Sequence, residues 1–146
     1  MMHPSGPRDP ALPRARRTLL IADADPAARR LALQALQPLG RCLEASDTDG
    51  ALAILDDLQP ALVVACLDTP AGATADGIEL IRFAGYEGPI LATTARGSLA
   101  QAVEAMKAGA SDVVIKPLSG HELARRAAAL LDEQPQSRAQ LPERRA

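Results

Sequence analysis

Aromatic side chains are almost absent from this chain of 146 residues, which has no tryptophan and only Phe83 and Tyr86. Proteins that bind single-stranded nucleic acids stack the bases on aromatic rings, and nucleic-acid-binding proteins in general concentrate positive charge on one face. The formal net charge here is −2. The composition therefore argues against a nucleic acid as a partner.

Cysteine, histidine and long apolar runs are also scarce. The cysteines are Cys42 and Cys66, and the histidines are His3 and His121. These four residues do not form the Cys/His cluster that a zinc site requires. No apolar run is long enough for a membrane span or has the form of an export signal. We expect a cytoplasmic protein with free thiols and without membrane association.

Five short apolar runs alternate with segments of helical periodicity. The runs predict strands at residues 18–22, 42–45, 62–67, 89–94 and 112–116. Start signals for five helices stand at Asp25, Asp47, Asp76, Ser98 and Ser119. Strands that alternate with helices require right-handed crossovers and a parallel sheet. The fold class is therefore α/β, with one domain at residues 17–132 and disordered tails at 1–16 and 133–146.

Two local predictions concern the third and fourth helices. Asp76 to Glu79 has the spacing of a capping box, with a carboxylate in place of the usual hydroxyl. The inward face of the fourth helix is predicted to carry Leu99, Ala102, Val103 and Met106.

The strand at residues 62–67 organises the chain, because a continuous apolar run is typical of a strand buried on both faces of a parallel sheet. Cys66, Leu67 and Asp68 stand at its C-terminal end. Open α/β sheets bind their ligands at the carboxyl ends of the strands. The candidate site is expected there.

Six short motifs follow one another along the chain: Ala22-Asp-Ala-Asp-Pro26, Pro60 through Pro70, Asp76-Gly77, Thr93-Thr94-Ala95, Ala108-Gly-Ala-Ser-Asp112 and Lys116-Pro117. In this order they resemble the receiver domain of bacterial two-component response regulators, from about Arg17 to Leu131. The resemblance implies a flavodoxin-like, doubly wound sheet of five strands in the order 2-1-3-4-5, with five helices. It also implies a phosphoacceptor aspartate after the third strand and an acidic pair that helps to hold Mg²⁺.

Several positions depart from that family pattern. The phosphoacceptor position holds Cys66, and Ala24 leaves Asp23 as the only member of the acidic pair. The aromatic switch position of the fifth strand holds Val113. The segment from Pro70 to Gly77 is about three residues longer than is usual for the family.

The two family residues that contact phosphoryl oxygens, Thr94 and Lys116, are retained. Mg²⁺ requires oxygen ligands, and a thiol is a poor substitute. We therefore expect weak or absent Mg²⁺ binding and no conventional phosphorylation of an aspartate. Lys116 then needs an anionic partner, for which Asp23 is the first choice and Asp68 the second.

Two alternatives retain some chemistry. Asp68 is a candidate displaced phosphoacceptor, although its carboxylate is expected outside the Thr94–Lys116 clamp, and positioning dominates phosphoryl transfer. Cys66 is a candidate thiol switch if Lys116 lowers its pKa, and otherwise a small side chain that fills space. A disulfide with Cys42 is not expected, because their strands are separated by the first strand.

The sequence therefore predicts a stand-alone pseudo-receiver, not an enzyme, that acts by phosphorylation-independent contact with another protein. The resemblance implies a contact face formed by the fourth helix, fifth strand and fifth helix, residues 98–108 and 117–131. The expected partner is a histidine kinase or a regulator, with a homodimer as an alternative. Candidate contact residues are Arg96, Lys107, His121, Arg125 and Arg126.

Overall fold

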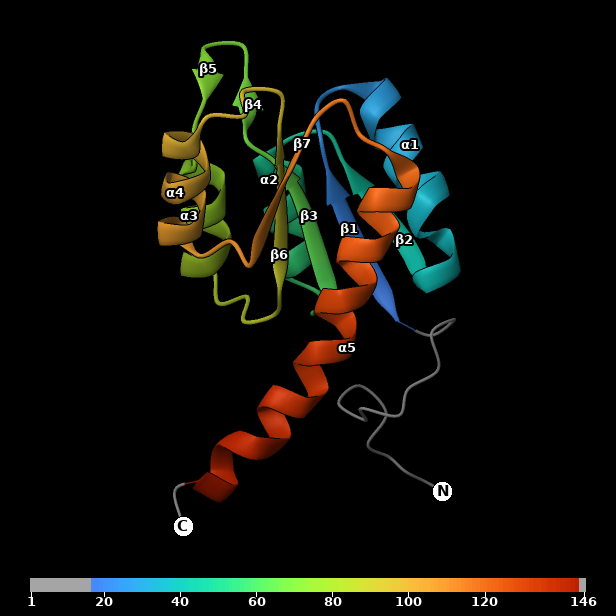
Figure 1. Ribbon diagram of the computed structural model, residues 1–146, viewed down its shortest axis with the longest axis vertical. Helices are drawn as coiled ribbons and strands as arrows, with labels where there is room; N and C mark the ends of the chain where they lie inside the picture. The colour runs from blue at the N-terminus through green and yellow to red at the C-terminus, as the bar shows by residue number, and fades with distance from the viewer. Residues whose placement is uncertain (1–16, 145–146) are drawn as a thin grey trace.

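The computed structural model describes residues 17–144 and has a five-stranded parallel sheet at its centre (Figure 1). Its strands are β1 (Thr18–Ala22), β2 (Arg41–Ala45), β3 (Leu62–Cys66), β6 (Ile90–Thr94) and β7 (Asp112–Ile115). They lie in the order β2-β1-β3-β6-β7, and every adjacent pair is parallel. The predicted flavodoxin-like fold is confirmed, since this is the order 2-1-3-4-5 when the strands of this sheet alone are counted.

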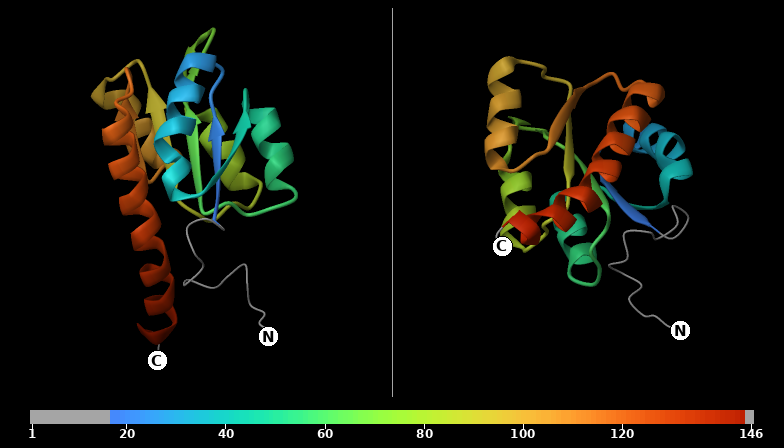
Figure 2. Two further views of the ribbon diagram at one scale, coloured as in Figure 1. Left: turned by 90° about the vertical axis from the view of Figure 1, so that its right-hand side faces the viewer. Right: turned by 60° about the horizontal axis from the view of Figure 1, so that its bottom comes forward.

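Helices cover both faces of the sheet, as Figures 1 and 2 show. Helices α1 (Pro26–Leu36) and α5 (Gly120–Arg144) lie on one face, and a short 3-10 helix, η3 (Gln37–Leu39), follows α1. Helices α2 (Thr48–Leu55), α3 (Asp76–Phe83) and α4 (Leu99–Ala108) lie on the other. Within residues 17–144, every helix is too short or too polar to traverse a lipid bilayer.

The core consists of two apolar layers that share β3 as their middle. Along β3, Leu62 and Val64 pack toward α1 and α5, whereas Val63 and Ala65 pack toward α2 and α3. All four are buried, as a central strand of a parallel sheet should be. The parallel pairing of β3 with β1 and β6 fixes the direction of the strand and therefore the edge at which Cys66 emerges.

Four of the five predicted helix start signals are confirmed. The side chains of Asp25, Asp47, Ser98 and Ser119 each accept a hydrogen bond from a backbone N–H of the following helical turn. The capping box at Asp76 was wrong. Ala75 is the N-cap without a side-chain bond, and Asp76 is the first helical residue, where a carboxylate still favours the positive end of the helix dipole.

The predicted inward face of α4 was also wrong. Leu99, Val103 and Met106 are 81%, 42% and 49% exposed, and the fully buried residue of the helix is Ala105. Small alanines let α4 approach the sheet closely, so the larger apolar residues point outward.

Two segments differ from the predicted loop and tail. The segment after β3 contains a two-stranded antiparallel hairpin, β4 (Asp68–Thr69) with β5 (Gly72–Ala73). The predicted tail at 133–146 differs from the structure, because α5 continues to Arg144 and projects beyond the sheet (Figure 1). The predicted tail at 1–16 and residues 145–146 lie outside the described residues.

Candidate functional site

Three predicted site residues meet at the C-terminal ends of three parallel strands. Asp23 follows β1, Cys66 ends β3, and Lys116 follows β7. The Lys116 Nζ atom lies 2.9 Å from Asp23 Oδ2 and 3.4 Å from Cys66 Sγ. The prediction that Asp23 pairs with Lys116 is borne out by this contact.

The ion pair between Lys116 and Asp23 is largely removed from water, with side-chain exposures of 12% and 7%. Burial by itself lowers the pKa of Lys116, but the hydrogen bonds and negative charge of Asp23 and Cys66 together outweigh it, so the pKa is raised overall. Lys116 is therefore an ammonium ion at neutral pH. Ala24 is exposed and adds no carboxylate to this pair.

The thiol of Cys66 has a raised pKa. Burial is the main cause, and the negative charges of Asp23 and Asp68 add to it, while the Asp68 N–H and Lys116 act in the opposite direction. The lowered pKa that a thiol switch would need is therefore contradicted. Burial and Glu44 also raise the pKa of Cys42, and both cysteines are free.

Asp68 lies in a different place from the one expected. Thr94 donates its hydroxyl proton to Asp68 Oδ1 at 2.8 Å, and the Ala95 N–H donates to Asp68 Oδ2 at 2.9 Å. The expectation that this carboxylate lies outside the Thr94–Lys116 clamp was wrong on the Thr94 side, since the Thr94 hydroxyl bonds it directly. The physical reason is that β3 ends at Cys66 and the chain turns into the β4–β5 hairpin, which begins at Asp68.

The remaining predicted position, Val113, lies on β7 three residues before Lys116. Its side chain is partly buried against the core layer beneath α2, α3 and α4. Thr94 is fully buried on the neighbouring strand. Valine has no ring that could change place with a moving hydroxyl, so the pocket lacks a rotating switch at this position.

A hollow of about 160 Å³ opens beside these residues. Its lining includes Asp23, Cys66 and Asp68 together with Ile78 and Ile81 of α3. The hollow thus lies between the strand ends and the helices α2 and α3.

Gly77 of α3 faces Thr48 of α2 beside this hollow. A Cβ atom at Gly77 would lie 2.8 Å from the Thr48 hydroxyl of α2. Only a residue without a side chain lets the two helices approach so closely.

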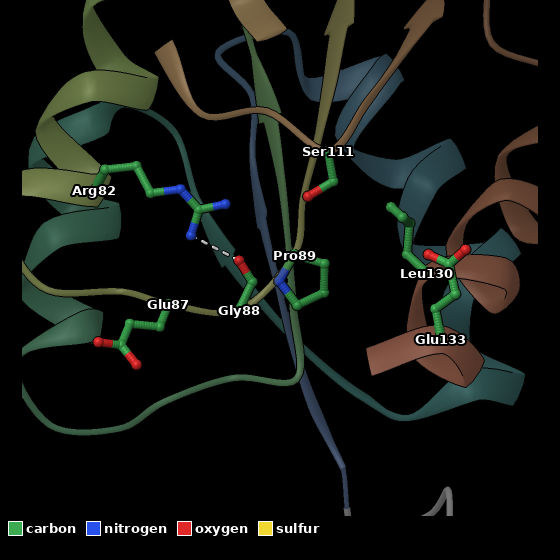
Figure 3. A pocket seen from close by; sticks show the side chains of 7 residues that line it. All are labelled: Arg82, Glu87, Gly88, Pro89, Ser111, Leu130 and Glu133. Carbon is green, nitrogen blue, oxygen red and sulfur yellow. Dashed lines mark hydrogen bonds between the residues drawn. The ribbon is translucent and has the colours of Figure 1, made fainter. Parts of the chain in front are cut away.

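A second hollow, of about 200 Å³, lies at the opposite edge of the sheet, next to the residues that precede β6 and β7 (Figure 3). Arg82 donates to the Gly88 carbonyl at 2.7 Å, to the Tyr86 carbonyl at 2.9 Å and to the Gly109 carbonyl at 2.7 Å. We call Arg82 and these three carbonyls the Arg82 cage. The guanidinium ties the turn after α3 to the turn after α4.

Sequence reasoning missed the Arg82 cage and the backbone donors Ala95 and Arg96. Backbone N–H groups carry no sequence signal, because every residue except proline has one. Arg82 had the appearance of an ordinary helical surface residue. In the hairpin, two-residue strands are too short to show alternation.

This combination of a doubly wound parallel sheet with an acidic residue, a hydroxyl and a lysine at its C-terminal edge defines the receiver class of signalling domains. The chain belongs to the response regulator receiver domain family, whose model matches residues 19–128. It is the receiver domain of a two-component response regulator.

Similar proteins support this assignment. The phosphate regulon transcriptional regulatory protein PhoB of Pseudomonas aeruginosa is 35% identical over 121 residues, which cover 79% of this chain and 52% of PhoB. Response regulator MprA of a Mycobacterium species is 35% identical over 128 residues, covering 82% of this chain and 54% of MprA. The chain spans about half the length of these curated relatives.

A solved structure gives the same fold. The receiver domain of NtrX from Brucella abortus superimposes with a TM-score of 0.71 and 26% sequence identity. The match covers 78% of this chain and 98% of that domain.

Proposed function

We propose that this receiver domain is a pseudo-receiver that signals by protein–protein contact, without phosphorylation, in the cytoplasm. One observation carries the proposal: Lys116 is bonded to Asp23 at 2.9 Å, and the phosphoacceptor position is a thiol. A lysine that is already paired has less attraction left for an incoming phosphoryl group. The two unpaired cysteines agree with a reducing compartment.

The donor set of the pocket does not suit Mg²⁺, the ion that the family implies. Mg²⁺ needs several oxygen ligands in octahedral geometry, and sulfur is too soft a ligand. Asp23 offers one carboxylate, which already bonds Lys116, while Ala24 and Cys66 offer none. We therefore propose that Mg²⁺ binds weakly or not at all, which also removes the main electrostatic support for phosphoryl transfer.

The proposed contact surface is the face of α4, β7 and α5. Leu99, Val103 and Met106 of α4 and Ile115 of β7 are exposed there. Exposed apolar groups that gather on one face are typical of a protein contact surface. The partner that fits this proposal is a histidine kinase or another regulator, and a second copy of the chain is the alternative.

The five basic candidates on this face fall into two groups. Arg125 and Arg126 already bond Glu122, and Arg126 also bonds Asp112 at 2.8 Å. Arg96, Lys107 and His121 are exposed. We therefore expect Arg96, Lys107 and His121 to contribute more to recognition of an acidic partner than the two arginines of α5.

Intact-mass measurement after incubation with acetyl phosphate and Mg²⁺ tests the absence of phosphorylation. We expect an unchanged mass for the wild type. A gain of one phosphoryl group would contradict the proposal. If Asp68→Asn abolished that gain, Asp68 would be the acceptor.

Asp68 remains the second candidate for chemistry because its carboxylate lies against Thr94, at 2.8 Å from the hydroxyl. The thiol switch has less support, since the pKa values of both cysteines are raised. Dilute peroxide should therefore modify Cys66 no faster than Cys42. Preferential oxidation of Cys66 would favour the thiol switch.

Oligomeric state tests the α4–β7–α5 face. If the partner is a second copy, Ile115→Asp should shift the sedimentation equilibrium to monomer. Phe83→Asp is the matched control, because Phe83 is 91% exposed but lies on α3. A dimer that Phe83→Asp dissolves and Ile115→Asp does not would place the interface elsewhere.

A further inference from the structure

Asp68 holds the loop between β6 and α4 through both of its carboxylate oxygens. Its Oδ1 atom accepts from the Thr94 hydroxyl at 2.8 Å, and its Oδ2 atom accepts from the Ala95 N–H at 2.9 Å. The Thr94 oxygen in turn accepts from the Arg96 N–H at 3.0 Å. The carboxylate thus bonds the last residue of β6 and the first residue of the loop, and Thr94 links it to the second loop residue, Arg96.

The β4–β5 hairpin keeps Asp68 in this position. Asp68 pairs with Ala73 across the hairpin, and the Thr69 hydroxyl donates to the Gly72 carbonyl at 2.7 Å. Gly72 has a φ of +133°, a backbone conformation that favours glycine. A side chain presented by a closed hairpin loses less entropy on binding than one on an open loop.

The loop that Asp68 holds leads directly into the proposed contact face. Ser98 caps α4, and a Cβ atom at Gly97 would lie 2.9 Å from Ile115 Cγ2, so the loop packs closely on β7. Leu99, the first residue of α4, is 81% exposed. The position of the loop therefore sets where α4 begins relative to Ile115.

We propose that Asp68 is an internal anionic ligand of the β6–α4 loop, which fixes the loop and the start of α4 in one arrangement without chemical modification. We call Asp68, Thr94 and Ala95 the Asp68 latch. This inference rests on the proposed function and deepens it, because it names the device that sets the contact face.

The latch also explains which free ligand the loop would accept if Asp68 were removed. The Thr94 hydroxyl and the Ala95 N–H are donors aimed at one carboxylate, and such a pair suits a small oxyanion such as inorganic phosphate. In the wild type, these donors are occupied and the charge of Asp68 repels another anion. Burial by itself raises the pKa of Asp68, but the bonds from Ala95 and Thr94 and the charge of Lys116 lower it overall.

Amide hydrogen exchange on the intact chain tests the latch. In Asp68→Ala, exchange at residues 94–98 should accelerate at least tenfold. Thr94→Val should also accelerate this exchange, and the double variant should accelerate it by less than the product of the two single effects, because both changes break the bond between Thr94 and Asp68. Asp76→Ala is the matched control, since it removes an exposed carboxylate at the start of α3 and should leave this exchange within twofold of the wild type.

Two results would overturn the latch: exchange within twofold of the wild type in Asp68→Ala, or multiplying effects in the double variant. If Asp68→Ala does not fold, Asp68→Asn gives the same test, because its amide keeps one acceptor oxygen. Asp68→Asn should then accelerate the exchange less than Thr94→Val does. Acceleration equal to or greater than that of Thr94→Val would overturn the latch.

Inorganic phosphate provides a second readout. It should shift the Ala95 amide resonance of Asp68→Ala and slow the exchange of residues 94–98, with no shift in the wild type. Equal binding by the two proteins, or binding by neither, would contradict the latch. If the latch proposal fails, the expected intact-mass result stays the same. If the wild type is phosphorylated, the proposed function fails and the exchange results are unaffected. The two failures are therefore distinguishable.

Discussion

The two edges of the sheet hold a partly buried cation in different ways. At the N-terminal edge, Arg82 donates hydrogen bonds to the backbone carbonyls of Tyr86, Gly109 and Gly88, the last of which Figure 3 shows, and its guanidinium also lies 5.7 Å from the centre of the Tyr86 ring. At the C-terminal edge, Lys116 bonds two side chains, Asp23 and Cys66.

This difference shows at which edge of the sheet an amino-acid substitution can remove the partner of the cation. A backbone carbonyl persists whatever residue carries it, so no second substitution can remove the acceptors of Arg82. The partners of Lys116 are side chains, and one substitution can replace either of them. The C-terminal edge can therefore lose its chemistry while the fold persists, and the four predictions below test this contrast.

The largest expected effect follows from loss of Lys116. Lys116→Met leaves the buried Asp23 carboxylate without its cation, which should reduce the free energy of unfolding by about 3 kcal/mol. Adding Asp23→Asn should recover most of this loss, because the amide carries no charge. Urea denaturation measures both, with the exposed Lys107→Met as control. A double variant no more stable than Lys116→Met would contradict the pairing.

Arg82→Met should have the next largest effect. It leaves three backbone carbonyls without their donor and should reduce the free energy of unfolding by about 2 kcal/mol. Restoration by a second side-chain change is not expected, in contrast to Lys116. Thermal unfolding detects the loss, with the exposed Arg30→Met as control. A stability within about 0.5 kcal/mol of the wild type would show that water replaces the guanidinium.

Restoring acidic residues should restore metal affinity. Ala24→Asp with Cys66→Asp would place three carboxylates at the C-terminal edge, together with Asp23. We expect Mg²⁺ affinity to rise at least tenfold, or about 1.4 kcal/mol, by isothermal titration calorimetry. The exposed carboxylates of Asp49 and Asp76 are present in both the wild type and the variant, so any Mg²⁺ that they bind gives the same background in both titrations. Unchanged affinity would mean that more than carboxylates is missing.

The smallest expected effect is the loss of stability at low pH that follows from protonation of Asp68. The pKa of Asp68 is lowered in the folded protein, so its contribution to stability is present above the ordinary aspartate pKa of about 3.9 and is lost as the pH falls through the folded value. The contribution should be below about 1 kcal/mol because Asp68 is only partly buried. The protection of the amides of residues 94–98, meaning their exchange rates corrected for the intrinsic pH dependence of amide exchange, should therefore fall in acid more in the wild type than in Asp68→Asn. An equal fall in protection would show that another group titrates.

Sequence patterns predicted the sheet well, because a strand such as 62–67 must be apolar on both faces and is flanked by prolines. The pairing of Asp23 with Lys116 followed from the cost of leaving a buried ammonium unpaired. These inferences succeed because a buried strand requires apolar residue types and a buried charge requires a residue of opposite charge.

Where the sequence misled, the cause was local geometry. The apolar residues of α4 follow a helical period, but Ala105 is the one that meets the sheet, so periodicity alone chose the wrong face. The Asp68 carboxylate was expected outside the Thr94–Lys116 clamp, whereas the chain turns into a hairpin and places this carboxylate against Thr94. Neither turn geometry nor a backbone donor such as Ala95 can be read from residue type.

The central claim is that the C-terminal edge already satisfies its own charges and therefore has no phosphoryl-dependent trigger. Fluorine NMR of the wild type with beryllium fluoride and Mg²⁺ tests it directly, since beryllium fluoride imitates a phosphoryl group. The account predicts only the resonances of the free fluorides. A slowly exchanging protein-bound resonance that requires Mg²⁺ and disappears in Asp68→Asn would contradict it.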